Sequence, residues 1–505
     1  MKKKGRANKW IWIAIAVFAV SVIFTYSLFF KKAVFTGKNK TVAVLPFTNL
    51  GADSSEEYLN DGMTDEIINQ LSKIKGLRVV ARSSVMKYKG HINDARHIGD
   101  TLNVAAVLTG GMRKSGDKLI IHASLMDIGS GNMIWDESYS RDTSDIFSIQ
   151  TNVAELIADK LNAVVSADEK NNILRRPTQN LEAYDRYLQG LYFWNQGTVL
   201  NFRKAIIFFN QAIQLDSGYS KAYSGLADCY SAIGYGSYEK PADAFLKAEQ
   251  AAEKALQLDS SLADPHTSLG YIRFYYYWDW PGAQKEFLTA LRLDPTYIMA
   301  YDSYCYYLTA MERFPEAREV IEKAVQLDPL SARMNTDLGF NLFYLHEYDQ
   351  AISTLKKSLA LNAKYGLTHI WLSRSYQEKK MFREAIDENR VVLKVNTNWA
   401  VALAAIGYIY GITGQREEAK KILDTMIRLS TSRYITPYGL ALVYASLNDR
   451  ENAFKFLDQA FADRANWLVW LELDPRWRII YDDSRYTALV EKVGLPKSFG
   501  KFSKK

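Results

Sequence analysis

A period of 34 residues, the spacing between Ala317 and Ala351, repeats through the C-terminal half of this 505-residue chain. Alanine recurs at that interval, and a second set of small residues recurs at a fixed position before each alanine. A period of this length is typical of a helix pair repeated along the chain, with small side chains where the helices pack closely. We therefore expect a stack of helix pairs rather than one globular core. The two sets are Ala317, Ala351, Ala385, Ala419 and Ala453, and Cys305, Gly339, Ser373, Gly407 and Ala441.

These positions resemble the tetratricopeptide repeat, in which proline often follows the second helix, as Pro295 and Pro329 do here. The same register continues upstream, with one extra residue in the repeat that contains Gly270 and a longer insertion around GYGSYEKPAD. The resemblance implies eight repeats over residues 181–463. An array of that length predicts a superhelix whose concave groove is lined by the first helix of each pair.

The ninth position of each first helix is expected to point into this groove. It holds four aromatic residues and one arginine, which are residue types that anchor partners at interfaces. Packing against neighbouring helices is the alternative explanation for the same residues. The predicted partner-binding ladder comprises Tyr271, Tyr306, Phe340, Arg374 and Tyr408.

Residues 10–30 form an uninterrupted apolar run without a charge. As a helix, such a run reaches about 30 Å, which is the thickness of the hydrocarbon core of a bilayer. A cleavable signal peptide is the alternative, but its apolar region usually spans only about 7 to 15 residues before a small-residue cleavage site. We therefore expect one uncleaved transmembrane helix at residues 10–30.

Basic residues concentrate around this run. Nine of the 63 Lys and Arg residues lie within residues 1–40, which contain no Asp or Glu, so 54 remain against 56 acidic residues in 41–505. The folded part thus lacks the basic excess that nucleic-acid binding requires. The positive-inside rule predicts a single-pass protein of the inner (cytoplasmic) membrane, with a cytoplasmic N-terminus and the bulk of the chain periplasmic or otherwise extracytoplasmic.

Residues 41–165 alternate between apolar extended runs and helical patterns, in the order β-α-β-α-β-β-β-α. The stretches VAVLPFTNLG, EYLNDGMTDEIINQLSKIKGLRVVARSSVMKYKG and GNMIWDESYSRDTSDIFSIQTNVAELIADKL resemble the TolB amino-terminal-like domain. The resemblance implies a small α/β domain that precedes helical repeats in membrane-linked signalling proteins. Some relatives carry a cyclase, a kinase or a CadC-like DNA-binding domain ahead of the membrane span. Only nine residues precede the span here, so none of those effector activities is expected.

The sequence contains no motif that indicates catalysis. Its two cysteines form no disulfide framework, and its six histidines show no metal-binding spacing. No P-loop, dinucleotide-binding or nucleophile-elbow motif occurs. We expect no catalytic residue, cofactor, metal or small-molecule substrate, and we interpret the chain as a non-enzymatic scaffold. It would bind a protein or peptide in the groove, within an envelope signalling or assembly complex. The alternatives are a sensory ectodomain that relays a signal to a separate cytoplasmic effector, and an unrecognised hydrolase.

The expected fold class combines one transmembrane helix, a small α/β (α+β) TolB-like domain, and an all-α tetratricopeptide-repeat superhelix with a C-terminal cap. The cap is predicted because the aromatic and charged sequence after the last repeat can cover its exposed apolar face. The predicted boundaries are a basic tail at 1–9, the anchor at 10–30, a juxtamembrane linker at 31–40, the TolB-like domain at 41–165, a polar linker at 166–180, eight repeats at 181–463, and the cap and tail at 464–505.

Overall fold

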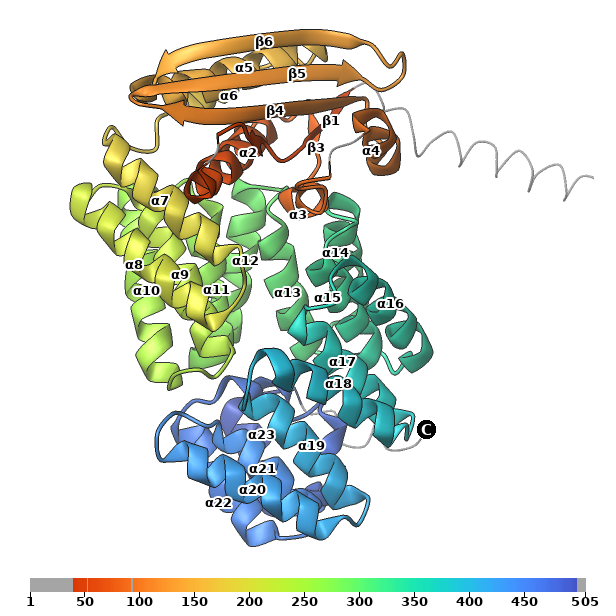
Figure 1. The fold of residues 1–505 in the computed structure, drawn as a ribbon. Helices are drawn as coiled ribbons and strands as arrows, with labels where there is room; N and C mark the ends of the chain where they lie inside the picture. Colours follow the sequence, from red (N-terminus) through yellow and green to blue (C-terminus); the bar gives the residue numbers. More distant parts are fainter. Residues whose placement is uncertain (1–39, 52, 92–93, 497–505) are drawn as a thin grey trace, which may run out of the picture. The chain divides into compact units, whose positions relative to one another are not determined.

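The computed structural model describes residues 40–51, 53–91 and 94–496. These residues form two compact units, one built on a β-sheet and one built of paired helices (Figure 1). The predicted transmembrane segment at 10–30 lies outside the described residues. Among those that are described, no helix is both long and apolar enough to cross a membrane.

The first unit is built on a six-stranded sheet with the strand order β3-β1-β4-β5-β6, while β2 pairs separately with β4. Strand β1 runs parallel to β3 and β4, whereas β4, β5 and β6 form an antiparallel meander. All four residues of β1 are buried, as expected of a central parallel strand covered on both faces. The strands are β1 (Thr41–Val44), β2 (Thr48–Asn49), β3 (Arg78–Val79), β4 (Ala106–Ser115), β5 (Lys118–Asp127) and β6 (Met133–Asp142).

Helices α2, α4 and α5 occupy the three predicted helical positions, whereas α3 was not predicted. The long helix α5 buries Val153 and Ile157 and follows the antiparallel strands (Figure 1). The second predicted strand is short, because the chain turns into helix α3 after Val80, where polar residues replace the apolar run. The helices in this part of the chain are α2 (Glu57–Ser72), α3 (Arg82–Met86), α4 (Ala95–Leu102) and α5 (Ile146–Lys160).

Residues 166–180, predicted to be a polar linker, contain the helix α6 (Ala167–Leu174). The N–H of Glu169 donates to Oγ of Ser166 (3.3 Å), and the N–H of Ser166 donates to the Glu169 carboxylate (2.8 Å). This reciprocal pair is a capping box, so the short sequence SADE starts a helix despite its low apolar content.

The repeats form sixteen helices between residues 181 and 462, which pair in sequence order into eight pairs. This confirms the predicted tetratricopeptide-like superhelix. The helices are α7 (Leu181–Trp194), α8 (Val199–Leu215), α9 (Ser220–Tyr235), α10 (Pro241–Leu258), α11 (Ala263–Ile272), α12 (Trp280–Leu293), α13 (Ile298–Ala310), α14 (Phe314–Leu327), α15 (Ala332–Tyr344), α16 (Tyr348–Leu361), α17 (Gly366–Glu378), α18 (Phe382–Val395), α19 (Ala400–Ile412), α20 (Arg416–Ser430), α21 (Pro437–Ser446) and α22 (Arg450–Ala462).

The small residues of the repeat period pack the helices of each pair together. All five alanines of the first set are completely buried. A Cβ atom added to Gly339 would come within 2.6 Å of the Leu355 side chain on the partner helix. The extra residue of the third repeat is absorbed by η4 (Arg273–Tyr277), a single π-helical turn at the end of α11. Such turns accommodate one inserted residue inside a helix.

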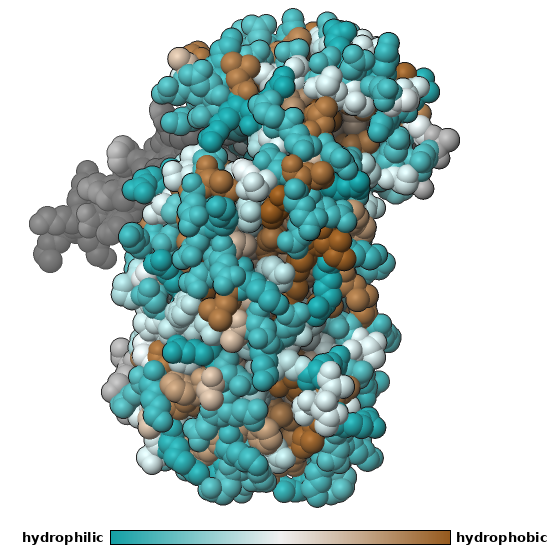
Figure 2. All heavy atoms as spheres, turned by 90° about the vertical axis from the view of Figure 1, so that its left-hand side faces the viewer, coloured by the Kyte–Doolittle hydropathy of each residue, from teal (hydrophilic) through white to brown (hydrophobic). Residues whose placement is uncertain are grey.

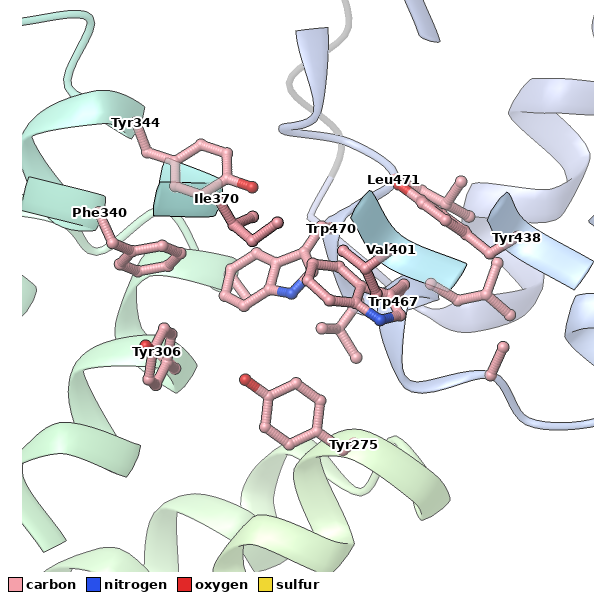
Figure 3. Close-up of a cluster of buried hydrophobic side chains, with 14 of the residues drawn as sticks. Tyr275, Tyr306, Phe340, Tyr344, Ile370, Val401, Tyr438, Trp467, Trp470 and Leu471 are labelled. Atoms are coloured by element: carbon pink, nitrogen blue, oxygen red, sulfur yellow. The ribbon is translucent and has the colours of Figure 1, made fainter. Parts of the chain in front are cut away.

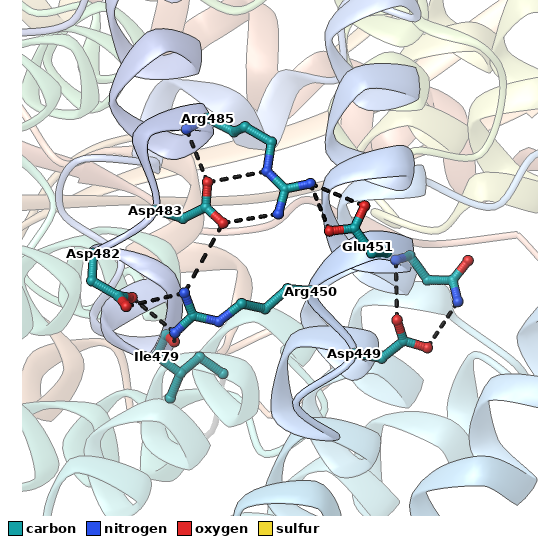
Figure 4. Close-up of polar contacts among 8 residues, drawn as sticks. Asp449, Arg450, Glu451, Ile479, Asp482, Asp483 and Arg485 are labelled. Atoms are coloured by element: carbon teal, nitrogen blue, oxygen red, sulfur yellow. Dashed lines mark hydrogen bonds and ion pairs between the residues drawn. The ribbon is translucent and has the colours of Figure 1, made fainter.

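The chain after α22 forms η5 (Asn466–Trp470), η6 (Pro475–Ile480) and α23 (Ser484–Val493). Exposed ion pairs join α22 to this cap (Figure 4): Arg450 pairs with Asp482 at 2.9 Å, and Arg485 pairs with Glu451 at 3.0 Å. Exposed pairs contribute little to stability. The burial of Trp477 in the same segment contributes more, because its whole side chain is removed from water.

Figure 2 shows a mostly hydrophilic face on which apolar residues gather near mid-height. Exposed large apolar side chains among the described residues include Leu200 and Ile207 on α8 and Leu246 on α10. These residues belong to the second helices of their pairs. They are therefore separate from the predicted ladder, which lies on first helices.

Candidate functional site

The predicted ladder lies on the first helices of five consecutive pairs, α11, α13, α15, α17 and α19. We call the side of the first helices that carries these residues the inner face. Tyr306, Phe340, Arg374 and Tyr408 are buried, with at most 5% of their surface exposed. Tyr271 is half-buried. The structure gathers the ladder on one face but leaves little of it in contact with solvent.

The ladder is covered by the cap segment, which we define as residues 466–477. The indole of Trp470 is 1% exposed, and its ring centroid lies 5.2 Å from that of Phe340 and 6.2 Å from that of Tyr306 (Figure 3). It also stacks on Tyr344 at 5.5 Å. Ring separations of this size are favourable aromatic contacts. Trp470 therefore occupies the position on the ladder that an aromatic anchor from a partner would take.

Arg374 is also engaged by the cap segment. Its guanidinium lies 5.2 Å from the ring of Trp467, and a terminal nitrogen lies 3.9 Å from the carboxylate of Asp474. Arg476 donates hydrogen bonds to the Asp474 carboxylate from its guanidinium, at 2.9, 3.2 and 2.6 Å, and from its backbone N–H, at 3.1 Å. Burial by itself would raise the pKa of Asp474, but Arg476 and Arg374 outweigh it and hold the pKa well below its usual range. Asp474 thus supplies the negative charge that Arg374 would otherwise take from a partner.

Other contacts fix the cap segment against repeats that are distant in sequence. The hydroxyl of Tyr408 donates to the carbonyl of Arg476 (3.1 Å), and the amide of Asn466 donates to the carbonyl of Tyr235 (2.9 Å). Tyr235 is the second residue of the stretch GYGSYEKPAD, so the insertion helps to hold the cap segment. Sequence reasoning missed this placement, although the unusual density of tryptophan in WLVWLELDPRW was a signal.

A second group of inner-face residues keeps some contact with solvent, and we call it the acidic surface. Its members are half-buried and come from α9, α11, α15 and the turn before α17. Arg333 lies close enough to the other members to change the pKa of Asp228, Tyr271 and Tyr365 electrostatically. Residues from four separate repeats therefore lie together. The acidic surface comprises Asp228, Asp264, Tyr271, Arg333 and Tyr365.

The two carboxylates of the acidic surface are poorly compensated. Each carboxylate accepts a hydrogen bond from a serine hydroxyl. Ser268 donates to Asp228 at 2.7 Å, and Ser224 donates to Asp264 at 3.2 Å. Burial and the neighbouring Asp264 raise the pKa of Asp228 to about 7. Burial also raises the pKa of Asp264. A carboxyl group in this state gains from a positive charge placed beside it.

A buried carboxylate pair adjoins the acidic surface. Asp302 and Asp337 are at most 1% exposed. Asp302 accepts from Arg333 at 2.5 Å, and Asp337 accepts from the hydroxyl of Tyr306 at 2.5 Å. Burial and the closeness of Asp302 raise the pKa of Asp337. The recurrence of Asp on successive first helices was the sequence signal for this group. Among the described residues, no cluster of three or more His, Cys, Asp or Glu side chains is placed to hold a metal ion.

Comparison with known proteins supports both structural parts of the chain. Residues 38–156 match the family described as "HilA/YgeH-like transcriptional regulator, second domain", and residues 400–432 match the tetratricopeptide repeat. The chain therefore contains tetratricopeptide repeats and a HilA-like domain. The narrower TolB-like assignment remains a prediction.

Two curated relatives match longer stretches of the chain. "Putative adenylate cyclase 3" of Rhizobium meliloti (strain 1021) is 33% identical over 187 residues, covering 37% of this chain and 32% of that protein. "Transcriptional regulator HilA" of Salmonella typhimurium is 22% identical over 343 residues, covering 66% of this chain and 53% of that protein. The chain thus spans about a third of the first relative and about half of the second. Among solved structures, the APC/C hetero-tetramer Cut9-Hcn1 is 16% identical, covers 69% of this chain and 63% of that chain, and has a TM-score of 0.45.

Proposed function

We propose that this chain is a non-enzymatic protein-interaction scaffold that binds a protein or peptide segment on the inner face of its repeats. The acidic surface is the observation that carries the proposal. It brings charged and aromatic side chains from several helix pairs together and keeps them partly accessible. Extended arrays of helix pairs offer such pre-formed surfaces for binding.

Tyr271 belongs both to the ladder and to the acidic surface, so it is the ladder residue that we expect a partner to contact. Tyr306, Phe340, Arg374 and Tyr408 lie under the cap segment. They would contact a partner only if that segment left the inner face.

The proposal includes an anchor in the inner membrane at residues 10–30, with the N-terminus in the cytoplasm and the repeats outside it. The uncharged run and its basic flanks support this placement. An anchor would raise the local concentration of the scaffold for a partner in the same envelope complex.

A sensory or regulatory role is the second candidate, and the relatives favour it. Two of them are named a putative adenylate cyclase and a transcriptional regulator, and the match to the regulator covers 66% of this chain. A module that accompanies such proteins could relay binding to a separate effector. A partner that contains a cyclase, kinase or DNA-binding domain would favour this candidate over an assembly scaffold.

The scaffold proposal can be tested by photocrosslinking from the inner face in intact cells. A benzophenone side chain would replace Tyr365 on the acidic surface and, as the control, Ile207 on α8, which is 56% exposed. We expect a discrete crosslinked protein from position 365 and not from position 207. Identical products from both positions, or none from position 365, would contradict binding on the inner face.

A further inference from the structure

A small cavity between the cap segment and the repeats is lined by two arginine side chains and, among the described residues, by no acidic one. Its volume is about 10 Å³, which is about the room that one water molecule takes. Arg374 belongs to the ladder, whereas Trp467 and Arg476 belong to the cap segment. Val401 of α19 and Tyr438 of α21 lie beside Trp467 and line the same cavity (Figure 3). The ladder and the cap segment thus meet at a cavity with a positively charged lining.

The guanidinium of Arg374 lines this cavity without a hydrogen-bond acceptor. Its side chain is only 4% exposed, yet neither Nη1 nor Nη2 donates a hydrogen bond to any described residue. Its central carbon lies 4.6 Å from the ring centroid of Trp371 and 5.2 Å from that of Trp467. These cation–π contacts attract the charge but offer the N–H groups no oxygen acceptor. The buried indole N–H of Trp467 also lacks an acceptor among the described residues. Buried donors in this state are uncommon in folded proteins.

Asp474 does not supply the missing acceptor, because its carboxylate is already fully used. Oδ1 accepts from the backbone N–H of Arg476 at 3.1 Å and from its Nε at 2.9 Å. Oδ2 accepts from Nη2 of Arg476 at 2.6 Å and from the hydroxyl of Tyr438 at 2.9 Å. Nη2 of Arg374 stays 3.9 Å from Oδ2, which is too far for a hydrogen bond. Two buried guanidinium groups therefore share one carboxylate, and among these three groups one positive charge is left over.

The chemistry of the cavity favours an anion over a water molecule. Arginine cannot lose its proton in a protein, and a buried charge without a partner is costly. A water molecule could accept from the free N–H groups, but the lining side chains offer its own hydrogens no carboxylate or amide oxygen, and it brings no charge. A small monovalent anion accepts from the same donors and balances the remaining charge.

We propose that this cavity binds a halide-sized anion such as chloride, held by the N–H groups of Arg374 and Trp467. Because Arg374 belongs to α17 and Trp467 to the cap segment, the bound anion would help to fix the cap segment on the inner face. The inference goes beyond the proposed scaffold function and does not depend on the identity of a partner.

The dependence of the stability of the full chain on chloride tests this inference. Potassium chloride would replace potassium gluconate stepwise at constant ionic strength, since gluconate is too large for the cavity. The urea midpoint would be followed by far-ultraviolet circular dichroism. The variant Arg374→Met removes the charge and keeps a long side chain beside the tryptophans. The matched control is Arg390→Met on α18, where the arginine side chain is 57% exposed.

We expect the urea midpoint of the unchanged chain and of Arg390→Met to rise with chloride. Once chloride exceeds its dissociation constant, each tenfold increase should raise the midpoint by about 0.5 M, because a ligand that binds only the folded chain stabilises it in this way. Arg374→Met should lack this rise. In gluconate it should be at least as stable as the unchanged chain, since it no longer buries an unbalanced charge.

An equal rise in Arg374→Met, or no rise in the unchanged chain, would overturn the inference. Crystals of the unchanged chain grown in bromide give a second test that does not require Arg374→Met to fold. An anomalous diffraction peak in the cavity, beside Arg374 and Trp467, is the expected result. A cavity that contains only water in those crystals would refute the anion site.

Discussion

Replacing Trp470 by alanine should strongly destabilise the repeat unit. The indole is 1% exposed, and four ring centroids, those of Phe274, Tyr306, Phe340 and Tyr344, lie within 6.2 Å of it. Removal of a buried Trp or Phe side chain costs about 3–5 kcal/mol through lost transfer energy and the cavity left behind. Each aromatic pair adds about 0.5–1.5 kcal/mol beyond buried area. Since neighbouring contributions are not additive, we expect a loss near the upper end, about 5 kcal/mol.

The change can be measured by urea unfolding followed by far-ultraviolet circular dichroism. With a slope of about 2–3 kcal/mol/M for the affected transition, a loss of about 5 kcal/mol lowers the midpoint by about 2 M. Trp194→Ala is the matched control, because Trp194 at the end of α7 is only half-buried and packs at a tilt against the ring of Phe202. Its removal should cost about 1–2 kcal/mol, in proportion to the smaller area taken from water.

Equal shifts for the two variants would refute the reasoning. That result would mean that the cap segment contributes little to the fold and can leave the inner face. Tyr306, Phe340, Arg374 and Tyr408 would then be available to a partner, as the sequence pattern alone predicts.

Three further predictions concern buried charges. Asp474→Asn leaves Arg374 and Arg476 buried without their counter-charge and should destabilise the repeat unit by about 3–5 kcal/mol, measured as a lower urea midpoint. The unchanged chain should lose this same stabilisation on acidification, because the pKa of Asp474 is lower in the folded chain than in the unfolded chain. The stabilisation by the Asp474 carboxylate is fully present above about pH 4. It disappears as the pH falls toward the folded-state pKa of Asp474. A pH titration of the urea midpoint should show that loss, and Asp474→Asn should lack it. Asp337→Asn should instead stabilise the unit by about 1 kcal/mol, because the new amide can donate a hydrogen bond to the unpartnered Oδ1 of Asp302. A lower urea midpoint than in the unchanged chain would contradict the formation of that hydrogen bond.

Much of the repeat architecture could be predicted because it depends on local periodicity. The buried alanines follow from a fixed spacing, and the π-helical turn at 273–277 follows from one extra residue in that spacing. The helix α6 could also have been predicted from its capping box, had apolar content not been given more weight. Each of these features arises from residues that are neighbours along the chain or along one repeat.

The state of the ladder could not be predicted in the same way. Periodicity places Phe340 on the inner face, but it does not reveal that Trp470, which follows several repeats later in the chain, packs on it. The choice between a partner-binding groove and internal packing depends on where the cap segment lies, which is a tertiary contact. The acidic surface was missed for a related reason: aspartates on single helices look solvated until several helices place them side by side.

The cap segment also changes how stability is distributed along the repeats. In an ordinary array each repeat contacts only its neighbours, so stability is a sum of local terms and the ends unfold first. Here the segment that follows the eighth pair contacts the third, fourth and fifth pairs through Trp470 and the second pair through Asn466. The end of the chain is therefore tied to the middle of the array, and unfolding of either should disrupt the other. Since Tyr271 and Asp228 lie on pairs held in this way, a partner bound to the acidic surface should raise the stability of the cap as well. Slower hydrogen exchange in α23 on adding the protein captured at position 365 would show that coupling. Unchanged exchange there, with protection confined to α9 and α11, would show that the two regions act independently.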